Sequence, residues 1–514
     1  MSKTIIIIGA GLAGLSAALQ AMENGCDVKL VSPFPSERAQ SVMAEGGINA
    51  ALNTKDEKDS PEEHFADTIK AAGGLADPNA VWGMTQAAPE LVHWLLKLGV
   101  LFNMSGYDDV DLRNFGGQKK KRTAFAQSDT GKQIMTAMID AVRQKEAAGT
   151  VERFSHHSFL TLRLCGNVCS GCVIRDEYSQ EIMELPGDAV IIASGGMHGL
   201  FGNTTGSLSN TGEVTAELFR LGVPLANGEM IQYHPTTVEC SGKRMLISEA
   251  ARGEGGRLFA TKDGQRWYFM EEKYPEMGNL MPRDITAREI WRISQESEVF
   301  LDMTEIPKEI ISDKLSGLAD DCMTYLHKDI QTEPVPVLPG IHYFMGGILV
   351  DEHHRTSIQN LYAAGECCAQ YHGANRLGGN SLLGALYGGR VAAKSACEQA
   401  GGVNLSCAAQ IDIPSAPQIA ATKQLNKIMQ EALGVVRNED RLLKGIQAVQ
   451  TLTGNLPLLG SAILNSALAR KESRGAHWRE DYPKRNDRDY LKTTVARFDG
   501  KQIQISFVPI PERR

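Results

Sequence analysis

The stretch that decides the fold is Ile5-Ile6-Ile7-Ile8-Gly9-Ala10-Gly11-Leu12-Ala13-Gly14. Four consecutive β-branched residues predict a strand that is buried on both faces, and an apolar helix follows the glycines directly. Gly9 permits a tight turn, Gly11 lets a pyrophosphate approach the backbone, and Gly14 lets the helix pack on the strand. The free N–H groups at the start of the helix favour an anion. The stretch therefore predicts a dinucleotide-binding unit, without indicating which dinucleotide.

Length and charge restrict the class of protein. A chain of 514 residues is too long for one hydrophobic core, so we expect roughly two to four domains. A formal net charge of −8, with no dominant basic tract, argues against a nucleic-acid-binding surface. No apolar run reaches the length of about 18 residues that a membrane span needs, and the first strand begins without a signal peptide before it. The expected location is the cytoplasm.

The cysteines do not indicate a metal site. Ten cysteines in a chain of this length are not a disulfide framework, and in the cytoplasm we expect thiols. Cys165, Cys169 and Cys172 come closest to the spacing of metal ligands. However, the alternating segments on either side of Gly166-Asn167 predict a β-hairpin, and no fourth ligand follows at zinc spacing.

Later segments enlarge the nucleotide-binding unit. Residues 27–32 predict its second strand, which ends at Ser32 where a standard NAD or FAD site has an acid. Because a serine still hydrogen-bonds a ribose hydroxyl, this weakens an NAD site more than an FAD site. Residues 188–192 predict another buried strand, which ends in Ala193-Ser194-Gly195-Gly196. A strand that returns so late is typical of large FAD-binding folds, whereas a compact NAD domain closes by about residue 150.

A change in residue composition along the chain predicts an inserted domain. From residue 233 to 344 polar helices and scattered charges replace the glycine-rich strands, and residues 360–366 then resume the first pattern. The resulting prediction is an α/β fold: a large Rossmann-like FAD-binding domain in two parts (1–232 and 345–408), an α+β capping domain between them (233–344), and a C-terminal helical domain (409–514). Periodicity predicts helices at 61–73, 85–98, 128–147 and within 416–473, and a terminal hairpin of residues 493–498 and 501–508 that turns at Asp499-Gly500.

Five ordered motifs carry a family resemblance. They are His234-Pro235-Thr236, Ser248 to Gly256, Pro282-Arg283-Asp284, His342 to Gly347, and His372 to Gly378. Together they resemble the flavoprotein subunits of succinate dehydrogenase and fumarate reductase, a superfamily that includes the L-aspartate oxidases. The resemblance runs from residue 4 to about 400, and Ser473 to His477 extends it into the tail.

The resemblance implies both a substrate and a reaction. Small dicarboxylates need charge-assisted donors in a desolvated cleft, and His234, Ser248, His342 and Arg376 match the family's carboxylate ligands. It also implies hydride transfer from N5 of reduced FAD to fumarate, with proton donation by Arg283. Arginine is a weak acid and must be re-protonated as it donates. The residues that match this relay are Glu249 and Arg252.

The expected FAD-binding residues come from the fingerprint, the end of the second strand, the glycine pair that follows it, and the returning segments. They are Gly9, Ala10, Gly11, Gly14, Ser32, Gln40, Ser41, Ala44, Glu45, Gly46, Gly47, Ala193, Gly195, Glu366, Ser381 and Leu382.

Two departures from the family pattern bear on the reaction. Membrane-bound members attach FAD covalently through a histidine, and the aligned residue here is Gln40, so we expect non-covalent FAD. In the family the covalent link raises the flavin potential and supports succinate oxidation, so its absence favours fumarate reduction. L-aspartate oxidase has a glutamate that meets the substrate ammonium, and the matching residue here is Phe115, which would leave an ammonium unpaired.

The preferred function is therefore the flavoprotein subunit of a fumarate reductase. Succinate dehydrogenase and L-aspartate oxidase are the alternative enzymes, and a dicarboxylate-sensing flavoprotein is the alternative without catalysis. The chain has no haem motif and no convincing iron–sulfur cysteine set, so its electrons must come from outside. The resemblance implies an iron–sulfur partner subunit, which would hold the chain at the inner face of the membrane where the complex is membrane-anchored.

Overall fold

The centre of the fold is a parallel sheet with the strand order β20-β10-β1-β2-β6. The computed structural model describes residues 2–106, 109–240, 243–401, 411–414 and 419–514. The isoleucine run forms the central strand, which pairs in parallel with β10 on one side and β2 on the other. The predicted α/β fold with a Rossmann-like sheet is confirmed. Its strands are β1 (Thr4–Ile8), β2 (Asp27–Ser32), β6 (Val151–Ser155), β10 (Ala189–Ile192) and β20 (Leu361–Ala363).

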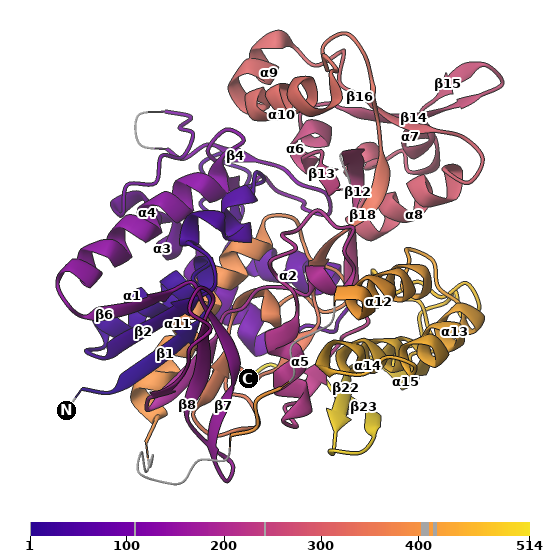
Figure 1. Ribbon diagram of the computed structural model, residues 1–514. Coiled ribbons are helices and arrows are strands. Elements are labelled where there is room, and N and C mark those ends of the chain that lie inside the picture. Colours follow the sequence, from indigo (N-terminus) through magenta and orange to yellow (C-terminus); the bar gives the residue numbers. More distant parts are fainter. Residues whose placement is uncertain (1, 107–108, 241–242, 402–410, 415–418) are drawn as a thin grey trace.

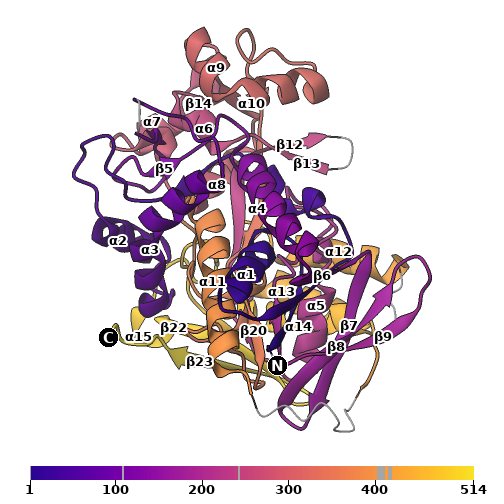
Figure 2. The same cartoon turned by 90° about the vertical axis from the view of Figure 1, so that its left-hand side faces the viewer.

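Both faces of this sheet are covered, which explains the unbroken apolar run in β1. Ile5 and Ile7 pack against helices, whereas Ile6 and Ile8 pack toward a three-stranded antiparallel sheet. Figures 1 and 2 show these helices and this sheet around the parallel sheet. The helices of this part are α1 (Leu12–Glu23), α2 (Pro61–Ala71), α3 (Pro78–Lys97), α4 (Thr130–Ala147) and α11 (Asn380–Gln399). The covering sheet contains the predicted hairpin of β7 (His157–Cys165) and β8 (Val168–Asp176), followed by β9 (Ile182–Pro186).

Helix α3 begins earlier than its periodicity predicts. The prediction placed its start at residue 85, but the helix starts at Pro78. Asp77 caps it, because its carboxylate accepts from the backbone N–H of Asn79 at 2.8 Å and of Ala80 at 3.3 Å. Proline at the first helical position is favourable, because its missing N–H is not needed there.

A small antiparallel sheet holds the segment after Gly47 against the loop that contains Phe115. Its strands are β3 (Ile48–Asn49), β4 (Leu112–Arg113) and β5 (Thr123–Ala124), with β5 in the middle. This sheet brings two loops together that are about 70 residues apart in the sequence.

An inserted lobe, residues 231–344, leaves and re-enters the rest of the molecule on paired strands (Figure 1). The antiparallel pairs Ile231–Phe344 and Gln232–Tyr343 form this stem. The strands of the lobe are β12 (Ile231–Cys240), β13 (Lys243–Leu246), β14 (Arg257–Lys262), β15 (Gln265–Trp267), β16 (Val299–Asp302), β17 (Val335–Pro336) and β18 (Leu338–Phe344). Its helices are α6 (Glu249–Gly253), α7 (Phe269–Lys273), α8 (Arg283–Ile293), α9 (Lys308–Lys314) and α10 (Ser316–Asp321).

The C-terminal region consists of helices, the first three of which share a hydrophobic core with α5 (Glu213–Arg220), followed by the predicted hairpin. The helices are α12 (Ile419–Ala432), α13 (Glu439–Val449), α14 (Asn455–Ala469) and the short α15 (Asp487–Tyr490). The hairpin strands β22 (Lys492–Phe498) and β23 (Ile503–Pro509) extend a second sheet with β11 (Leu225–Ala226), β19 (Gly347–Leu349) and β21 (Cys368–Ala369). The last part of the chain therefore shares a sheet with earlier segments. The predicted domain boundary at 408–409 and the predicted helical residues 416–418 lie outside the described residues.

The expectation that every cysteine is a thiol is wrong at Cys165, which is disulfide-bonded. This half-buried residue ends β7 at the turn of the hairpin. Within the described ranges, no group of three or more histidine, cysteine or acidic side chains is arranged to hold a metal ion.

No helix in the described part of the chain combines the length and apolarity that crossing a bilayer requires.

Candidate active site

A cavity of about 1070 Å³ runs from the glycine fingerprint to the inserted lobe. Of the predicted site residues, all but Gly14 and Arg252 line this cavity. Gly14 faces the strand, since a Cβ there would lie 1.8 Å from the carbonyl oxygen of Gly9. Arg252 lies behind Glu249, which does reach the cavity. The structure thus brings together residues that are separated by more than 350 positions in the sequence.

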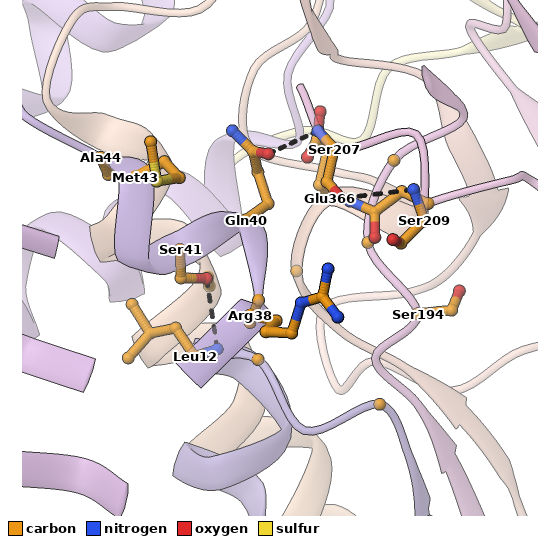
Figure 3. A pocket seen from close by; sticks show the side chains of 18 of the residues that line it. Leu12, Arg38, Gln40, Ser41, Met43, Ala44, Ser194, Ser207, Ser209 and Glu366 are labelled. Carbon is orange, nitrogen blue, oxygen red and sulfur yellow. Dashed lines mark hydrogen bonds between the residues drawn. The ribbon is translucent and has the colours of Figure 1, made fainter. Parts of the chain in front are cut away.

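The fingerprint end of the cavity fits a dinucleotide pyrophosphate. Gly9 has a φ of 112°, and a Cβ at this position would lie 2.2 Å from the carbonyl oxygen of Ala193. Helix α1 starts directly after Gly11 and has no acidic residue in its first turn. Its N-terminus therefore offers backbone donors and positive potential to an anion. The side chain of Ser41 accepts from the backbone N–H of Leu12 at 3.3 Å and fixes the following loop beside the helix (Figure 3).

Gln40 occupies the side of the cavity next to this loop. Its Oε1 atom accepts a hydrogen bond from the backbone N–H of Ser207 at 2.6 Å (Figure 3). Ser207 belongs to the segment after β10, which also lines the cavity. The amide side chain therefore connects the two walls of the nucleotide-binding part.

The glycine pair at 46–47 is held by a buried cation. Arg113 donates from Nε to the carbonyl oxygen of Gly46 at 3.0 Å and from NH2 to that of Glu45 at 2.9 Å. Burial lowers the pKa of Arg113 to about 10, so it stays protonated at neutral pH. Burial, with Asp321 adding to it, raises the pKa of the Glu45 carboxyl to about 8. Glu45 therefore presents a mostly neutral carboxyl to the cavity at neutral pH.

Three charged side chains form a continuous chain at the lobe end of the cavity. Arg283 is the first residue of α8, and its Nε donates to Oε2 of Glu249 at 2.7 Å. NH2 of Arg252 lies 3.2 Å from Oε1 of the same carboxylate. Burial by itself raises the pKa of Glu249, but the two arginines outweigh it and the pKa is lowered. Glu249 is therefore ionised, and its carboxylate lies between the guanidinium groups of Arg252 and Arg283. Whether these three residues form a proton relay stays a prediction.

Two buried histidines line the same end of the cavity as Arg283 and Glu249. The rings of His234 on β12 and His342 on β18 lie 5.1 Å apart between centroids. Burial first, and then the nearby Arg283, holds the pKa of both histidines well below the ordinary value. Both imidazoles are therefore neutral near neutral pH, and each has one donor and one acceptor nitrogen.

Arg376 is a buried cation without an acidic partner. Its side chain is 3% exposed and lies over the ring of Tyr343 at 4.4 Å. In the part of the chain that the structure describes, no carboxylate lies within ion-pair distance of it and its Nε has no hydrogen-bond partner. Burial lowers the pKa of Arg376 to about 9, which leaves it charged at neutral pH. A buried unpaired guanidinium is costly, so the arrangement favours an anion in the cavity.

The comparisons with known proteins agree with this geometry. Residues 4–382 match the family described as "FAD binding domain", and residues 452–513 match "Fumarate reductase flavoprotein C-term". The succinate dehydrogenase flavoprotein subunit of Bacillus subtilis is 39% identical, with 100% of this chain and 98% of that protein covered. The chain belongs to the FAD-binding flavoprotein family of succinate dehydrogenases and fumarate reductases. It is accordingly an FAD-dependent oxidoreductase of the succinate/fumarate family.

Two further matches show the range of this flavoprotein family. The L-aspartate oxidase of Streptomyces coelicolor is 32% identical and is covered over 94% of its length by all of this chain. The solved quinol fumarate reductase flavoprotein of E. coli has a TM-score of 0.86 at 27% identity, with 99% of this chain and 97% of that chain covered. The predicted resemblance is confirmed at the level of the family, whereas the direction of the reaction and the attachment of FAD are not decided by these matches.

Some contacts of the flavoprotein site are absent from the motif-based prediction. Gln232 accepts from NH1 of Arg283 at 3.1 Å and donates to the carbonyl oxygen of Arg376 at 2.8 Å, so it links the side chain of Arg283 to the backbone at Arg376. Gln232 could have been predicted as a site residue, because it lies two residues before His234 on β12 and alternate residues of a strand share a face. Arg113 is not among the predicted site residues, because its contacts with the glycine pair depend on the tertiary fold.

Proposed function

We propose that the chain is the catalytic flavoprotein subunit of a fumarate reductase. The observation that carries this proposal is the convergence of the Arg252–Glu249–Arg283 chain, two neutral histidines and the unpaired Arg376 on one cavity. Together with Ser248, which also lines the cavity, the two histidines and Arg376 offer four donors to a small dicarboxylate. An arginine backed by a carboxylate suits proton transfer beside them.

The residues of the cavity have distinct roles in this proposal. His234, Ser248, His342 and Arg376 bind and orient the two carboxylates of fumarate. Arg283 donates a proton to one alkene carbon, and Glu249 carries the replacement proton from the side of Arg252. Bound FAD, when reduced, supplies the hydride for the other carbon. Addition of one hydride and one proton to the double bond gives succinate, and closure by the inserted lobe excludes water.

Gln40 is the residue that favours fumarate reduction over succinate oxidation in this proposal. In the family the covalent histidine link raises the flavin potential, and an amide cannot form that bond. A difference of about 30 mV in a two-electron couple corresponds to roughly 1.4 kcal/mol, so the missing link shifts the balance toward fumarate reduction. The similarity to a succinate dehydrogenase subunit makes succinate oxidation the second candidate. Aspartate oxidation is disfavoured by Phe115, whose buried ring offers no negative charge to an ammonium group.

The electron donor is inferred from the relatives, several of which are named as flavoprotein subunits. We infer an iron–sulfur subunit as the partner of this chain and the cytoplasmic side of the membrane as the location of the complex. Purification from the native host, with iron analysis of the proteins that accompany the chain, identifies the partner.

The function is tested by anaerobic assays of the FAD-loaded protein. With reduced viologen as donor, we expect fumarate-dependent oxidation that exceeds succinate-dependent dye reduction under matched conditions. A higher rate with succinate would assign the dehydrogenase direction, and oxygen-dependent oxidation of aspartate would assign the oxidase. A preparation that binds FAD and dicarboxylate but turns over none of these substrates would support the sensor alternative.

The attachment of FAD is tested separately, by denaturation. We expect acid or heat to release all the flavin into the supernatant, because Gln40 offers no nucleophile to the cofactor. The measurement is flavin fluorescence of the denatured chain after gel separation, with a covalent family member as the positive control. Flavin fluorescence that stays with the chain would contradict the prediction.

A further inference from the structure

The segment Asn203–Ser207 connects the flavin side of the cavity to the substrate side. It follows β10 and lies along β18, where the backbone N–H of Thr205 donates to the carbonyl oxygen of Ile341 at 2.9 Å. Thr205 and Ser207 both line the cavity. The segment therefore stands directly beside His342 and beside Gln40.

Three side-chain contacts fix this segment in place. Thr204 Oγ1 lies 3.1 Å from Nδ1 of His198, Thr205 Oγ1 lies 2.8 Å from Nδ1 of His342, and the backbone N–H of Ser207 donates to Gln40. Its two ends are thus held independently of the middle contact. A hydroxyl at position 205 is consequently presented to His342 in a fixed position.

The Thr205 hydroxyl can decide which ring nitrogen of the neutral His342 imidazole carries the proton. A carboxylate ligand needs a donor, so the nitrogen of His342 that meets it must carry the proton. Nδ1 is occupied by Thr205, which leaves Nε2 for the substrate. The other acceptor for the Thr205 hydroxyl, the carbonyl oxygen of Ile341, is farther away at 3.4 Å. Donation by the hydroxyl to Nδ1 places the imidazole proton on Nε2.

The contacts of His234 do not fix a tautomer in the same way. The carbonyl oxygen of Thr236, which can only accept, lies 3.1 Å from Nδ1 of His234, and the backbone N–H of Thr236, which can only donate, lies 3.3 Å from the same atom. His342 is therefore the histidine whose tautomer a side-chain hydroxyl can set.

We propose that Thr205 is a positioning residue that fixes the Nε2–H tautomer of His342, so that this histidine donates to the dicarboxylate. The proposal rests on the proposed function for the identity of the ligand, but the tautomer itself does not. It also assigns a task to Gln40, which anchors the segment at the position where other members of the family bind their flavin covalently.

The first test is binding and turnover in FAD-loaded variants. For Thr205→Val we expect the dissociation constant for succinate, followed by the flavin absorbance, and the KM for fumarate to rise about tenfold, because a buried Nδ1 loses its donor. The kcat should fall by less than about threefold. Thr205→Ser should restore both constants to within about twofold, since the hydroxyl returns.

Thr237→Val is the matched control. Its buried hydroxyl also donates to β18, to the carbonyl oxygen of Leu338 at 2.7 Å, but it does not touch His342. This variant should bind succinate as the wild type does. Equal loss of binding in both valine variants, or no rescue by serine, would show that Thr205 has only a structural role.

The second test separates the proposal from the proposed function. In protein labelled with ¹⁵N-histidine, the imidazole signals of His342 are identified by their loss in His342→Gln. We expect shifts of the Nε2–H tautomer in the wild type and a mixture of tautomers in Thr205→Val. An unchanged tautomer in Thr205→Val would overturn the proposal even if fumarate is reduced, and the predicted change would uphold it even if fumarate is not the substrate.

Discussion

Replacement of Arg283 by lysine is expected to lower kcat for fumarate reduction by about 10³-fold, within the range of 10² to 10⁴ that general acid catalysis supplies. Lysine keeps a positive charge beside Glu249, so the buried carboxylate is not left without a partner. It cannot reproduce the fork in which Nε and NH2 of Arg283 lie 2.7 and 2.6 Å from Oε2 of Glu249. The measurement is steady-state turnover with reduced viologen, together with FAD content and the dissociation constant for succinate.

The control for this variant is Arg288→Lys on the same helix. Arg288 lies over the ring of Trp478 at 4.0 Å, away from the relay, and its replacement should change kcat by less than about twofold. Binding of succinate should stay within about threefold of wild type in both variants, because Arg376 and the histidines remain. Arg283→Lys that retains a tenth or more of the wild-type kcat would show that the proton comes from another group.

The sequence predicted the fold well where local patterns and buried strands coincide. Ile5 to Ile8 became the central strand because each residue has a covered face, and the turn at Asp499-Gly500 lies between the two strands predicted around it. The start of α3 was missed because the decisive signal, capping by Asp77, precedes the apolar periodicity. The disulfide at Cys165 has no signal in local sequence, since it depends on which segment the fold brings nearby.

The grouping of the site residues could not be predicted from local sequence patterns. Arg283, Glu249 and Arg376 come from three separate segments, and no spacing rule predicts that they share a cavity; only the family resemblance grouped them. Contacts that depend on loop geometry were not predicted, such as that between Thr205 and His342 or between Gln232 and Arg283. These contacts position the residues of the motifs, so they follow from the tertiary fold and not from the motifs themselves.

The ion-pair partners of the buried arginines differ between the cavity and the rest of the protein. The buried arginines of the chain fall into two groups, those with acidic partners and those without. Arg470 is fully buried, and its guanidinium lies 2.7 Å from Glu229 and 2.8 Å from Glu472. Arg376 is almost as deeply buried, at 3% exposed, but in the described ranges no acidic side chain lies within ion-pair distance of it. A natural protein retains such an unpaired charge where a ligand supplies the counter-ion.

This contrast gives a prediction with opposite signs for stability and binding. Arg376→Met removes a buried cation that lacks a partner, so the midpoint of unfolding in urea should stay the same or rise. The dissociation constant for succinate should increase at least about 100-fold, because a charge-assisted contact with one carboxylate is lost in a desolvated cavity. Arg470→Met, in contrast, leaves the buried carboxylate of Glu229 without its cation, while Glu472 keeps Arg474 at 2.7 Å. Loss of one partner of a buried pair costs about 3–5 kcal/mol.

The two methionine variants are compared in the FAD-loaded protein, with unfolding followed by circular dichroism and binding by flavin absorbance. Arg470→Met should unfold at a clearly lower urea concentration, while the fraction that remains folded binds succinate normally. If Arg376→Met were destabilised as much as Arg470→Met and still bound succinate, its charge would have a structural partner and no role at the substrate. If Arg376 is retained to bind the dicarboxylate, its replacement weakens binding without lowering the urea midpoint of unfolding. The reason is that its buried charge destabilises the free protein and is compensated only when the ligand is bound.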